Sequence, residues 1–291
     1  MAMRSWLFVP GDSQPKLDKV AGFGADVVIV DLEDAVAPPA KPQARIMARE
    51  WLQQGARTPG GPARWVRINP LDTPLWREDV AAIMPGRPQG IVVPKAAGPE
   101  QLQALVGELV AQEQRHGIEQ GSTRILPLVS ETPAAALGIS AYATIAVPRL
   151  AGLTWGAEDL SAAIGAARKR DADGRWTDTF RFVRSQVLLA AHARNIMAVD
   201  TLHAEFRDLA GLERAARESY ADGFTGMLAI HPSQVAVINA AFTPGEDEIA
   251  QARAIVNAFS AHPGVGALSL DGRMLDQPHL EQARRLLERV G

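Results

Sequence analysis

Charged side chains of catalytic type stand at the ends of short apolar runs in this chain. Glu131 ends the run Ile-Leu-Pro-Leu-Val-Ser-Glu, and Asp159 follows the next run, after Gly156-Ala157-Glu158. Two carboxylates, several waters and a substrate oxygen are a usual coordination shell for Mg²⁺, which keeps part of its hydration. We interpret Glu131 and Asp159 as metal ligands. The alternatives are a helix cap for Glu131 and a first-turn helix acid for Asp159.

Three more carboxylates, Asp31, Glu33 and Asp34, lie within four residues. Alternation along a strand would point Asp31 and Glu33 to the same side. So many acids beside Glu131 and Asp159 would repel one another strongly without a cation. We therefore expect Asp31 and Glu33 to hold the waters of a bound metal ion. The alternative is a solvated acidic turn.

Three basic or titratable residues complete the inventory. Arg67 suits forked binding of a substrate carboxylate or carbonyl, unless it forms a structural ion pair with Glu33 or Asp34. Lys95 has the same two interpretations, and a Schiff-base role would require burial and a lowered pKa. His231 precedes a proline and is either a ligand contact or a hydrogen-bonded structural histidine.

The apolar runs themselves predict the fold. Each is short, bounded by Gly, Pro or charge, and followed by a helix-like stretch, as expected of buried parallel strands. Eight such units predict a TIM (β/α)₈ barrel, in which chemistry takes place at the C-terminal ends of the strands. The runs cover residues 4–10, 26–33, 64–69, 90–95, 124–131, 149–156, 196–200 and 226–231. Asp200 also ends one of them.

The chain is predicted to divide into a barrel catalytic domain, residues 1–242, and a C-terminal extension, residues 243–291. Within the barrel, helices are expected over 38–54, from 99, from 132, and over 178–194 and 205–220. The extension reads as a helix over 245–261, an extended piece at 267–270, a turn, and a last helix ending at 290. Such an appendage must bury its apolar face on its own barrel or on a neighbour. We expect it to form a lid and an oligomer contact.

Composition excludes several classes of protein. The chain has 291 residues, a net charge of -3 and a pI near 6.1, so nothing indicates a nucleic-acid or anionic-membrane partner. Without cysteine, it can have no disulfide, thiolate zinc site or cysteine nucleophile. No zinc-protease or Walker-type motif occurs. With no signal peptide and no apolar stretch of about 20 residues, a cytoplasmic protein is expected.

A set of segments, in order from Arg4 to the final helix, resembles the citrate lyase β-subunit-like proteins of the HpcH/HpaI aldolase superfamily. Malyl-CoA and citramalyl-CoA lyases are relatives within that superfamily. Each segment alone is a weak signal, whereas the ordered set is specific. The segments are Leu7–Gly11, Asp31–Val36 with Lys41 and Arg45, Arg67–Asn69, Pro94-Lys95, Glu131-Thr132, Gly156–Leu160 and Ile230–Gln234.

The resemblance implies a Mg²⁺-dependent lyase that cleaves a 3-hydroxy-3-carboxy acyl thioester such as citramalyl-CoA or malyl-CoA. Acetyl-CoA and a 2-keto acid would be the products. It assigns Glu131 and Asp159 to the metal and Asp31 and Glu33 to its water shell. Arg67 would hold and polarise the substrate oxygen.

Further residues follow from the same resemblance. Gly156 and Ala157 would contact substrate. Asp276, in Gly-Arg-Met-Leu-Asp-Gln-Pro, matches an acid that reaches the active site of an adjacent subunit, commonly within a trimer. A homotrimer or a multiple of it is therefore expected. Asp276 could instead cap the last helix.

Two departures from the family pattern affect the thioester. The family usually has Arg where this chain has Ser13, and Lys where it has Met227. The remaining candidate phosphate partners are Lys16, Lys19, Lys41 and Arg45. Three alternatives stay open: a citrate lyase β subunit acting on a carrier-protein thioester, a metal-dependent aldolase acting on free 2-keto acids, and a non-catalytic binding or assembly subunit.

Overall fold

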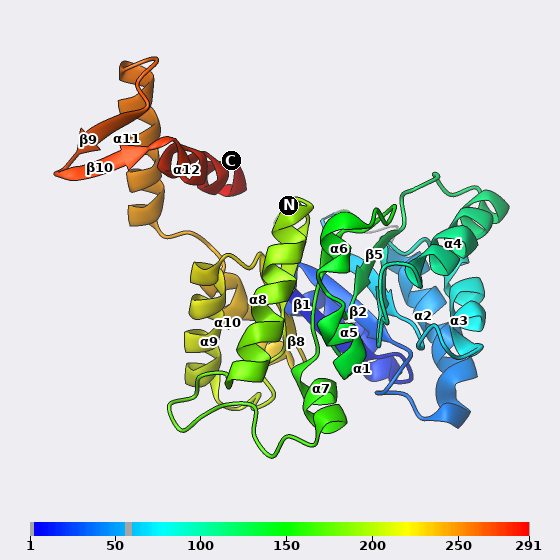
Figure 1. The fold of residues 1–291 in the computed structure, drawn as a ribbon. Coiled ribbons are helices and arrows are strands. Elements are labelled where there is room, and N and C mark those ends of the chain that lie inside the picture. Colours follow the sequence, from blue (N-terminus) through cyan, green and yellow to red (C-terminus); the bar gives the residue numbers. More distant parts are fainter. Residues whose placement is uncertain (1–2, 56–59, 291) are drawn as a thin grey trace. The chain divides into compact units, whose positions relative to one another are not determined.

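Eight parallel strands form a near-closed barrel in the computed structural model, which describes residues 3–55 and 60–290 (Figure 1). The strand order is β5-β4-β3-β2-β1-β8-β7-β6. The remaining seam is joined by parallel bridges from Ile125 to Leu150 and from Leu128 to Thr154. The predicted TIM-like α/β fold is confirmed. The strands are β1 (Ser5–Pro10), β2 (Val27–Asp31), β3 (Ala63–Arg67), β4 (Gly90–Val93), β5 (Arg124–Pro127), β6 (Gly152–Leu153), β7 (Met197–Asp200) and β8 (Gly226–Ala229).

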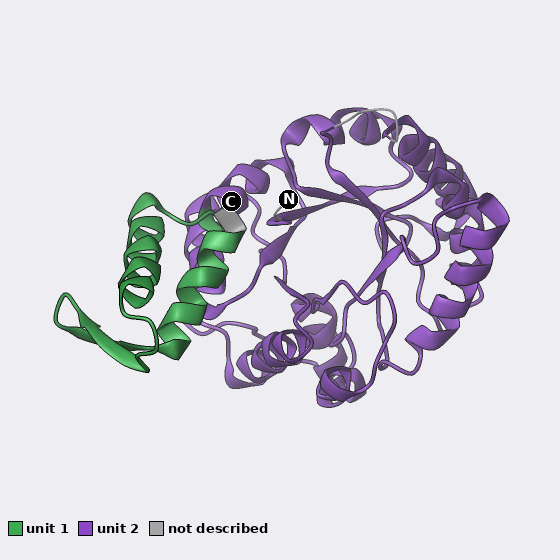
Figure 2. Cartoon of the chain, turned by 90° about the horizontal axis from the view of Figure 1, so that it is seen from above, with its two compact units in different colours: residues 1–2, 241–291 green, residues 3–240 purple. Residues whose placement is uncertain are grey.

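Helices surround this ring of strands (Figure 2). The helix predicted from residue 178 is present as Asp178–Ala193. The helix predicted from residue 205 begins later, at Leu209. Asp208 caps it there, because its side chain accepts a hydrogen bond from the Gly211 N–H. The helices of this unit are α1 (Gln14–Val20), α2 (Lys41–Gly55), α3 (Leu75–Ile83), α4 (Leu102–His116), α5 (Pro133–Leu137), α6 (Ala141–Thr144), α7 (Ala157–Ile164), α8 (Asp178–Ala193), α9 (Leu209–Asp222) and α10 (Pro232–Ala241), with 3-10 turns η1 (Ala21–Phe23), η2 (Pro38–Ala40) and η3 (Met84–Gly86).

Most strands end earlier than their apolar runs do. The run 90–95 leaves the ladder at Val93, because Pro94 has no N–H and Lys95 takes a positive φ of 50°. The run 149–156 forms the two-residue strand β6, flanked by isolated bridges at Leu150 and Thr154, and Arg149 at its start has a positive φ of 71°. The residues beyond each strand are thereby released to turn over the mouth of the barrel, which we define as the C-terminal ends of the strands.

Large aromatic side chains fill part of the core. Trp6 and Trp65 are buried and meet edge to face with ring centroids 5.0 Å apart. A Cβ on Gly90 would lie 2.3 Å from the Trp65 ring, so β4 needs glycine at this point. Tight packing of this kind fixes the register of the strands that carry the site.

The residues from 241 on form a second compact unit, shown in green in Figure 2. It contains α11 (Glu246–Ala261), the antiparallel hairpin of β9 (Ala267–Leu270) and β10 (Arg273–Asp276), and α12 (Gln277–Val290). Phe259, Leu275 and Leu280 are the buried residues of its own small core. β9 is the extended piece that the sequence predicted, and β10 is a second strand that was not predicted. Among the described residues, no helix is long and apolar enough to cross a membrane.

Candidate active site

Residues from four strand ends meet at the mouth of the barrel. Asp31 and Arg67 are the last residues of β2 and β3, Lys95 follows β4, and Glu131 follows β5. Glu33 and Asp34 come from the turn after β2, and Asp159 lies in the first turn of α7. We call Asp31, Glu33, Asp34, Glu131 and Asp159 the acidic cluster.

Arg67 is held by two carboxylates. Its Nε and Nη2 donate to the two oxygens of Asp31 at 2.7 and 2.6 Å, and its Nη1 lies 3.0 Å from Glu33 Oε2. Burial alone would raise the pKa of Asp31, but the hydrogen bonds and charge of Arg67 bring it below its ordinary value. The ion pair with Glu33, one of the two sequence interpretations, is therefore present. It anchors the guanidinium firmly at the mouth.

Lys95 contacts the cluster through both its backbone and its side chain. Its N–H donates to Glu131 Oε2 at 2.5 Å. Its ammonium pairs with Glu33, lies 3.1 Å from Asp34 Oδ2 and 3.8 Å from Asp159 Oδ1. Burial would lower the pKa of Lys95, yet the hydrogen bonds and charges of Glu33 and Asp34 raise it overall. A Schiff-base nucleophile needs the opposite shift.

Glu131 has a strongly raised pKa. Its side chain is buried, and burial together with the charge of Asp159 raises the pKa of Glu131 to about 8, despite the N–H of Lys95. Gly156 makes room for it: a Cβ there would lie 2.8 Å from both Cγ and Oε1 of Glu131. The sequence places a glycine where the carboxylate passes closest to the backbone.

The mouth gathers more negative than positive charge, which suits a divalent cation. Two cations, Arg67 and Lys95, form ion pairs with four of the five carboxyl groups of the acidic cluster, and Glu131 accepts from the backbone N–H of Lys95. Oxygen donors are the ligands of Mg²⁺, and Glu131 and Asp159 could supply two of them. Among the described residues, no group of three His, Cys, Asp or Glu side chains is arranged to hold a metal. The two carboxylates would fit Mg²⁺ only with water and substrate oxygens as the remaining ligands, since this ion accepts oxygen donors and keeps several waters.

In metal-free protein, the raised pKa of Glu131 predicts that stability falls as the pH rises from about 5 to about 8. Folded Glu131 keeps its proton until about pH 8, whereas the unfolded carboxyl loses it near its ordinary value of 4.5. The native state thus binds more protons in this window, and each pH unit lowers the free energy of unfolding by at most about 1.4 kcal/mol. The raised pKa of Glu33 adds to the same trend.

Urea unfolding in EDTA, compared across this pH range, measures the effect. Glu131→Gln should flatten the slope, and saturating Mg²⁺ should flatten it as well, because a ligated Glu131 is already ionised. A stability that stays constant or rises from pH 5 to 8 in EDTA would contradict the perturbed state of Glu131.

The backbone of Gly156 and Ala157 is fixed by neighbouring hydroxyl groups. The Gly156 N–H donates to Ser130 Oγ at 3.2 Å, and the Ala157 N–H points to Thr201 Oγ1 at 3.5 Å. Gly156 is the N-cap of α7, which carries Asp159 in its first turn. These contacts fix the loop in which the family resemblance predicts substrate contacts.

Residues 4–232 match the family described as HpcH/HpaI aldolase/citrate lyase. The chain belongs to that family. A citrate lyase subunit beta-like protein of Mycobacterium tuberculosis is 36% identical over 98% of this chain and 95% of its own length. Mitochondrial citramalyl-CoA lyase of Rattus norvegicus is 32% identical over 98% of this chain and 85% of its own.

A solved structure of protein CitE from Mycobacterium tuberculosis, in complex with magnesium, acetoacetate and coenzyme A, covers all of this chain and 98% of its own. Its TM-score is 0.79 and its identity 35%. The predicted family membership is confirmed. Relatives of this HpcH/HpaI family member are named as lyases, and a structure of one holds magnesium and coenzyme A.

Two candidate site residues from the sequence, Asp200 and His231, have partners outside the acidic cluster. Asp200 accepts hydrogen bonds from Trp155 Nε1 at 2.7 Å, Ser219 Oγ at 2.7 Å and Arg184 Nε at 2.9 Å, so its carboxylate ties β7 to the helices. His231 stacks on Phe206, with centroids 4.7 Å apart, and its Nδ1 bonds Ser233 Oγ. Asp200 is thus a structural residue.

Lys41 and Arg45, expected as phosphate partners, are buried in the barrel unit of this HpcH/HpaI protein. Lys41 Nζ donates to the carbonyls of Leu32 and Glu33 at 2.7 and 2.9 Å. Arg45 pairs with Asp79 at 2.7 Å and with Glu78. The expectation is wrong for these two residues, because internal acceptors hold both cations away from solvent.

Sequence reasoning missed one supporting pair, Asn69 and Asp79. Fully buried Asp79 accepts from the backbone and side-chain N–H groups of Asn69, both at 2.7 Å, and Asn69 Nδ2 also donates to the Leu32 carbonyl. The pair braces the turns that follow β2 and β3. The available signal was a carboxylate among the apolar residues Trp76, Val80 and Ile83 of α3.

Asp276 belongs to the second unit, where it ends β10 and immediately precedes α12. Its Oδ1 lies 2.5 Å from His279 Nδ1, and its N–H donates to the same ring nitrogen. The position is that of a helix N-cap, with a side-chain partner in the first turn. Its role in the family's active site stays a prediction.

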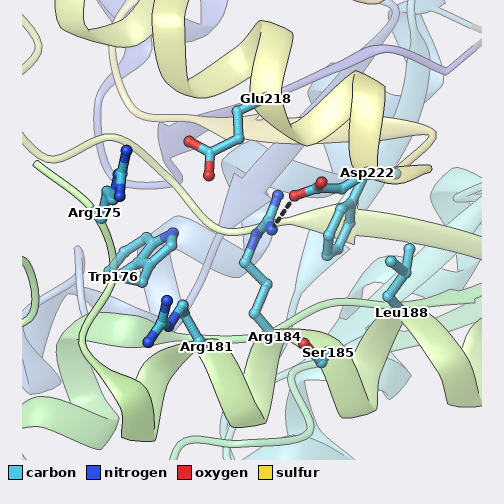
Figure 3. Close-up of a pocket in the computed structure, with 9 residues that line it drawn as sticks. Arg175, Trp176, Arg181, Arg184, Ser185, Leu188, Glu218 and Asp222 are labelled. Atoms are coloured by element: carbon cyan, nitrogen blue, oxygen red, sulfur yellow. Dashed lines mark hydrogen bonds and ion pairs between the residues drawn. The ribbon is translucent and has the colours of Figure 1, made fainter.

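A separate surface pocket of 310 Å³ lies along α8 (Figure 3). Arg184 in its wall is paired with Asp222 at 2.6 Å and with Asp200, and Arg181 is paired with Asp178. No member of the acidic cluster lines it. Three of its charged residues thus have partners within the chain, and we assign the pocket no ligand.

Proposed function

We propose that this chain is a Mg²⁺-dependent carbon–carbon lyase that cleaves a 3-hydroxy-3-carboxy acyl-CoA, such as citramalyl-CoA, to acetyl-CoA and a 2-keto acid. The observation that carries the proposal is the pairing of buried Glu131 with Asp159 beside a forked Arg67. Glu131 and Asp159 would hold the metal ion. Asp31 and Glu33 would order its waters and fix Arg67.

The remaining donors of Arg67 suit a developing oxyanion. A guanidinium has five N–H groups. Nε and Nη2 donate to Asp31, whereas Nη1 lies 3.0 Å from Glu33 Oε2 as an ion pair without a hydrogen bond, so both terminal nitrogens keep N–H groups that these carboxylates do not engage. Both could donate to the substrate oxygen as it becomes a ketone. Fixed donors of this kind favour the transition state because they need no reorganisation.

Cleavage runs as a retro-Claisen reaction. The substrate hydroxyl would give its proton to water and become an alkoxide. The alkoxide would collapse to a ketone as the neighbouring carbon–carbon bond breaks, and the electron pair of that bond would form the enolate of the acetyl thioester. Asp276 would protonate that enolate carbon, from an adjacent subunit of a homotrimer, with the second unit forming the contact. When bound, Mg²⁺ would withdraw charge from the oxygens of the hydroxy acid. Gly156 and Ala157 would line the substrate through their backbone.

One observation favours a second candidate, the citrate lyase β subunit acting on a carrier-protein thioester. Lys41 and Arg45 are engaged inside the fold, and Ser13 and Met227 replace basic family residues. Lys16 and Lys19, both exposed on α1, are the phosphate partners that remain of the four expected. A chain with few basic residues to bind the phosphates of CoA would suit a thioester that is carried by a protein instead.

The deciding experiment is a lyase assay on purified protein with (S)-citramalyl-CoA and malyl-CoA, in Mg²⁺ and in EDTA. We expect acetyl-CoA and a 2-keto acid in Mg²⁺ and none in EDTA, and the ratio of the two rates would name the better substrate. If neither thioester is cleaved although Mg²⁺ binds, the same assay with the citryl thioester of an acyl carrier protein, and with free hydroxy acids, separates the alternatives.

A further inference from the structure

The backbone of Lys95 adopts a conformation that has a cost for any residue but glycine. Its φ of 50° lies in the left-handed region, directly after Pro94. This turn directs the Lys95 N–H at Glu131 Oε2, 2.5 Å away. Strain of this kind persists where the surroundings require it. Here the requirement is a hydrogen bond to the buried carboxyl group of Glu131.

The side chain of Lys95 then bridges two parts of the acidic cluster. On one side it pairs with Glu33 and Asp34, from the turn after β2, and on the other it lies 3.8 Å from Asp159 on α7. The side chain is about one-third exposed, at 32%. Its ammonium can therefore leave the cluster for solvent without unpacking the core.

We propose that Lys95 is a positioning residue whose ammonium acts as a resident counter-cation, balancing the acidic cluster in the metal-free protein and competing with a divalent cation for it. The inference rests on the proposed function, because it takes Glu131 and Asp159 as the metal ligands. A dication on Asp159 would repel an ammonium 3.8 Å from the same carboxylate. Metal binding must therefore displace the ammonium or weaken its contact, and this lowers metal affinity.

Lys95→Met separates these effects, since methionine keeps an apolar stem and the backbone N–H but removes the charge. Calorimetric titration of the full chain with MgCl₂ should give a Kd lower by on the order of tenfold than wild type. In EDTA the same variant should melt at a lower temperature, because the carboxylates lose their counter-cation. Added Mg²⁺ should raise its Tm more than that of wild type.

Lys169→Met is the matched control. Lys169 pairs with Glu158, the chain neighbour of Asp159, outside the acidic cluster. Its Mg²⁺ affinity should equal that of wild type. Metal-free Lys95→Met could fold too poorly to be titrated with MgCl₂. In that case Lys95→Gly removes the same charge while relieving the positive φ, and should show the same lower Kd for Mg²⁺.

An Mg²⁺ affinity of the Lys95 variants that is unchanged or weaker would overturn the inference. Glu131→Gln separates this failure from failure of the proposed function. If Glu131→Gln loses Mg²⁺ while Lys95→Met binds as wild type does, the inference about Lys95 alone is wrong. If Glu131→Gln keeps wild-type affinity, the metal site itself is wrong.

Discussion

Replacing Asp276 by Asn is expected to lower kcat by ~10²–10⁴ while leaving Mg²⁺ affinity unchanged, because the change removes a proton donor and no metal ligand. The two side chains have nearly the same shape, so the hairpin and α12 should keep their structure. Steady-state cleavage of citramalyl-CoA at saturating substrate measures kcat, and calorimetric titration measures the Mg²⁺ affinity.

Asp271→Asn is the control for this substitution. Asp271 lies in the turn of the same hairpin with φ 49°, a conformation that Asn tolerates, and its loss removes an equal charge. Turnover should then stay at the wild-type level. If Asp276→Asn itself turned over at the wild-type rate, Asp276 would not be the proton donor. Its role would then be to cap α12, as its contact with His279 already suggests.

The trimeric arrangement can be tested with the same variant. If Asp276 serves the site of an adjacent subunit, co-expression of Asp276→Asn with Arg67→Met should produce mixed oligomers in which some sites combine an intact Arg67 with an intact Asp276. Activity should then exceed that of either variant alone. Mixed oligomers without recovered activity would argue that both residues act within one chain.

Gly156→Ala is the second substitution with a large expected effect. Its φ of -112° is open to any residue, so alanine adds no backbone strain. The new Cβ would lie 2.8 Å from Glu131 Cγ and Oε1, and Glu131 is buried too tightly to move away freely. The carboxylate must shift by a few tenths of an ångström or more, away from its proposed ligand position.

We expect Gly156→Ala to reduce kcat/KM by about 10²-fold, since small displacements of reacting groups have effects of this size. Mg²⁺ affinity should fall in parallel, and raising Mg²⁺ should recover part of the activity. Gly107→Ala in α4 is the control: nothing lies within 4 Å of the added Cβ, so activity should stay unchanged. Normal Mg²⁺ binding by Gly156→Ala would show that Glu131 is not a ligand.

Much of the site was predictable because a parallel barrel converts chain order into position. Each apolar run ends at one rim, so Asp31, Arg67 and Glu131 could be expected near one another without coordinates. The same rule failed for Asp200, the last residue of its strand, because the rule fixes the rim a residue reaches and not the direction of its side chain. Arg184 and Ser219 turn that carboxylate toward the helices.

The sequence by itself determined the family, the barrel and the inventory of acids and bases, since these depend on local periodicity and on the order of motifs along the chain. Tertiary structure alone decided which charged side chains at the mouth of the barrel pair with one another and how their pKa values shift. Lys95 and Glu33, 62 residues apart, form a pair, and burial beside Asp159 raises the pKa of Glu131 to about 8. Such effects depend on through-space distance and on exclusion of water, and neither quantity is contained in the local order of residues.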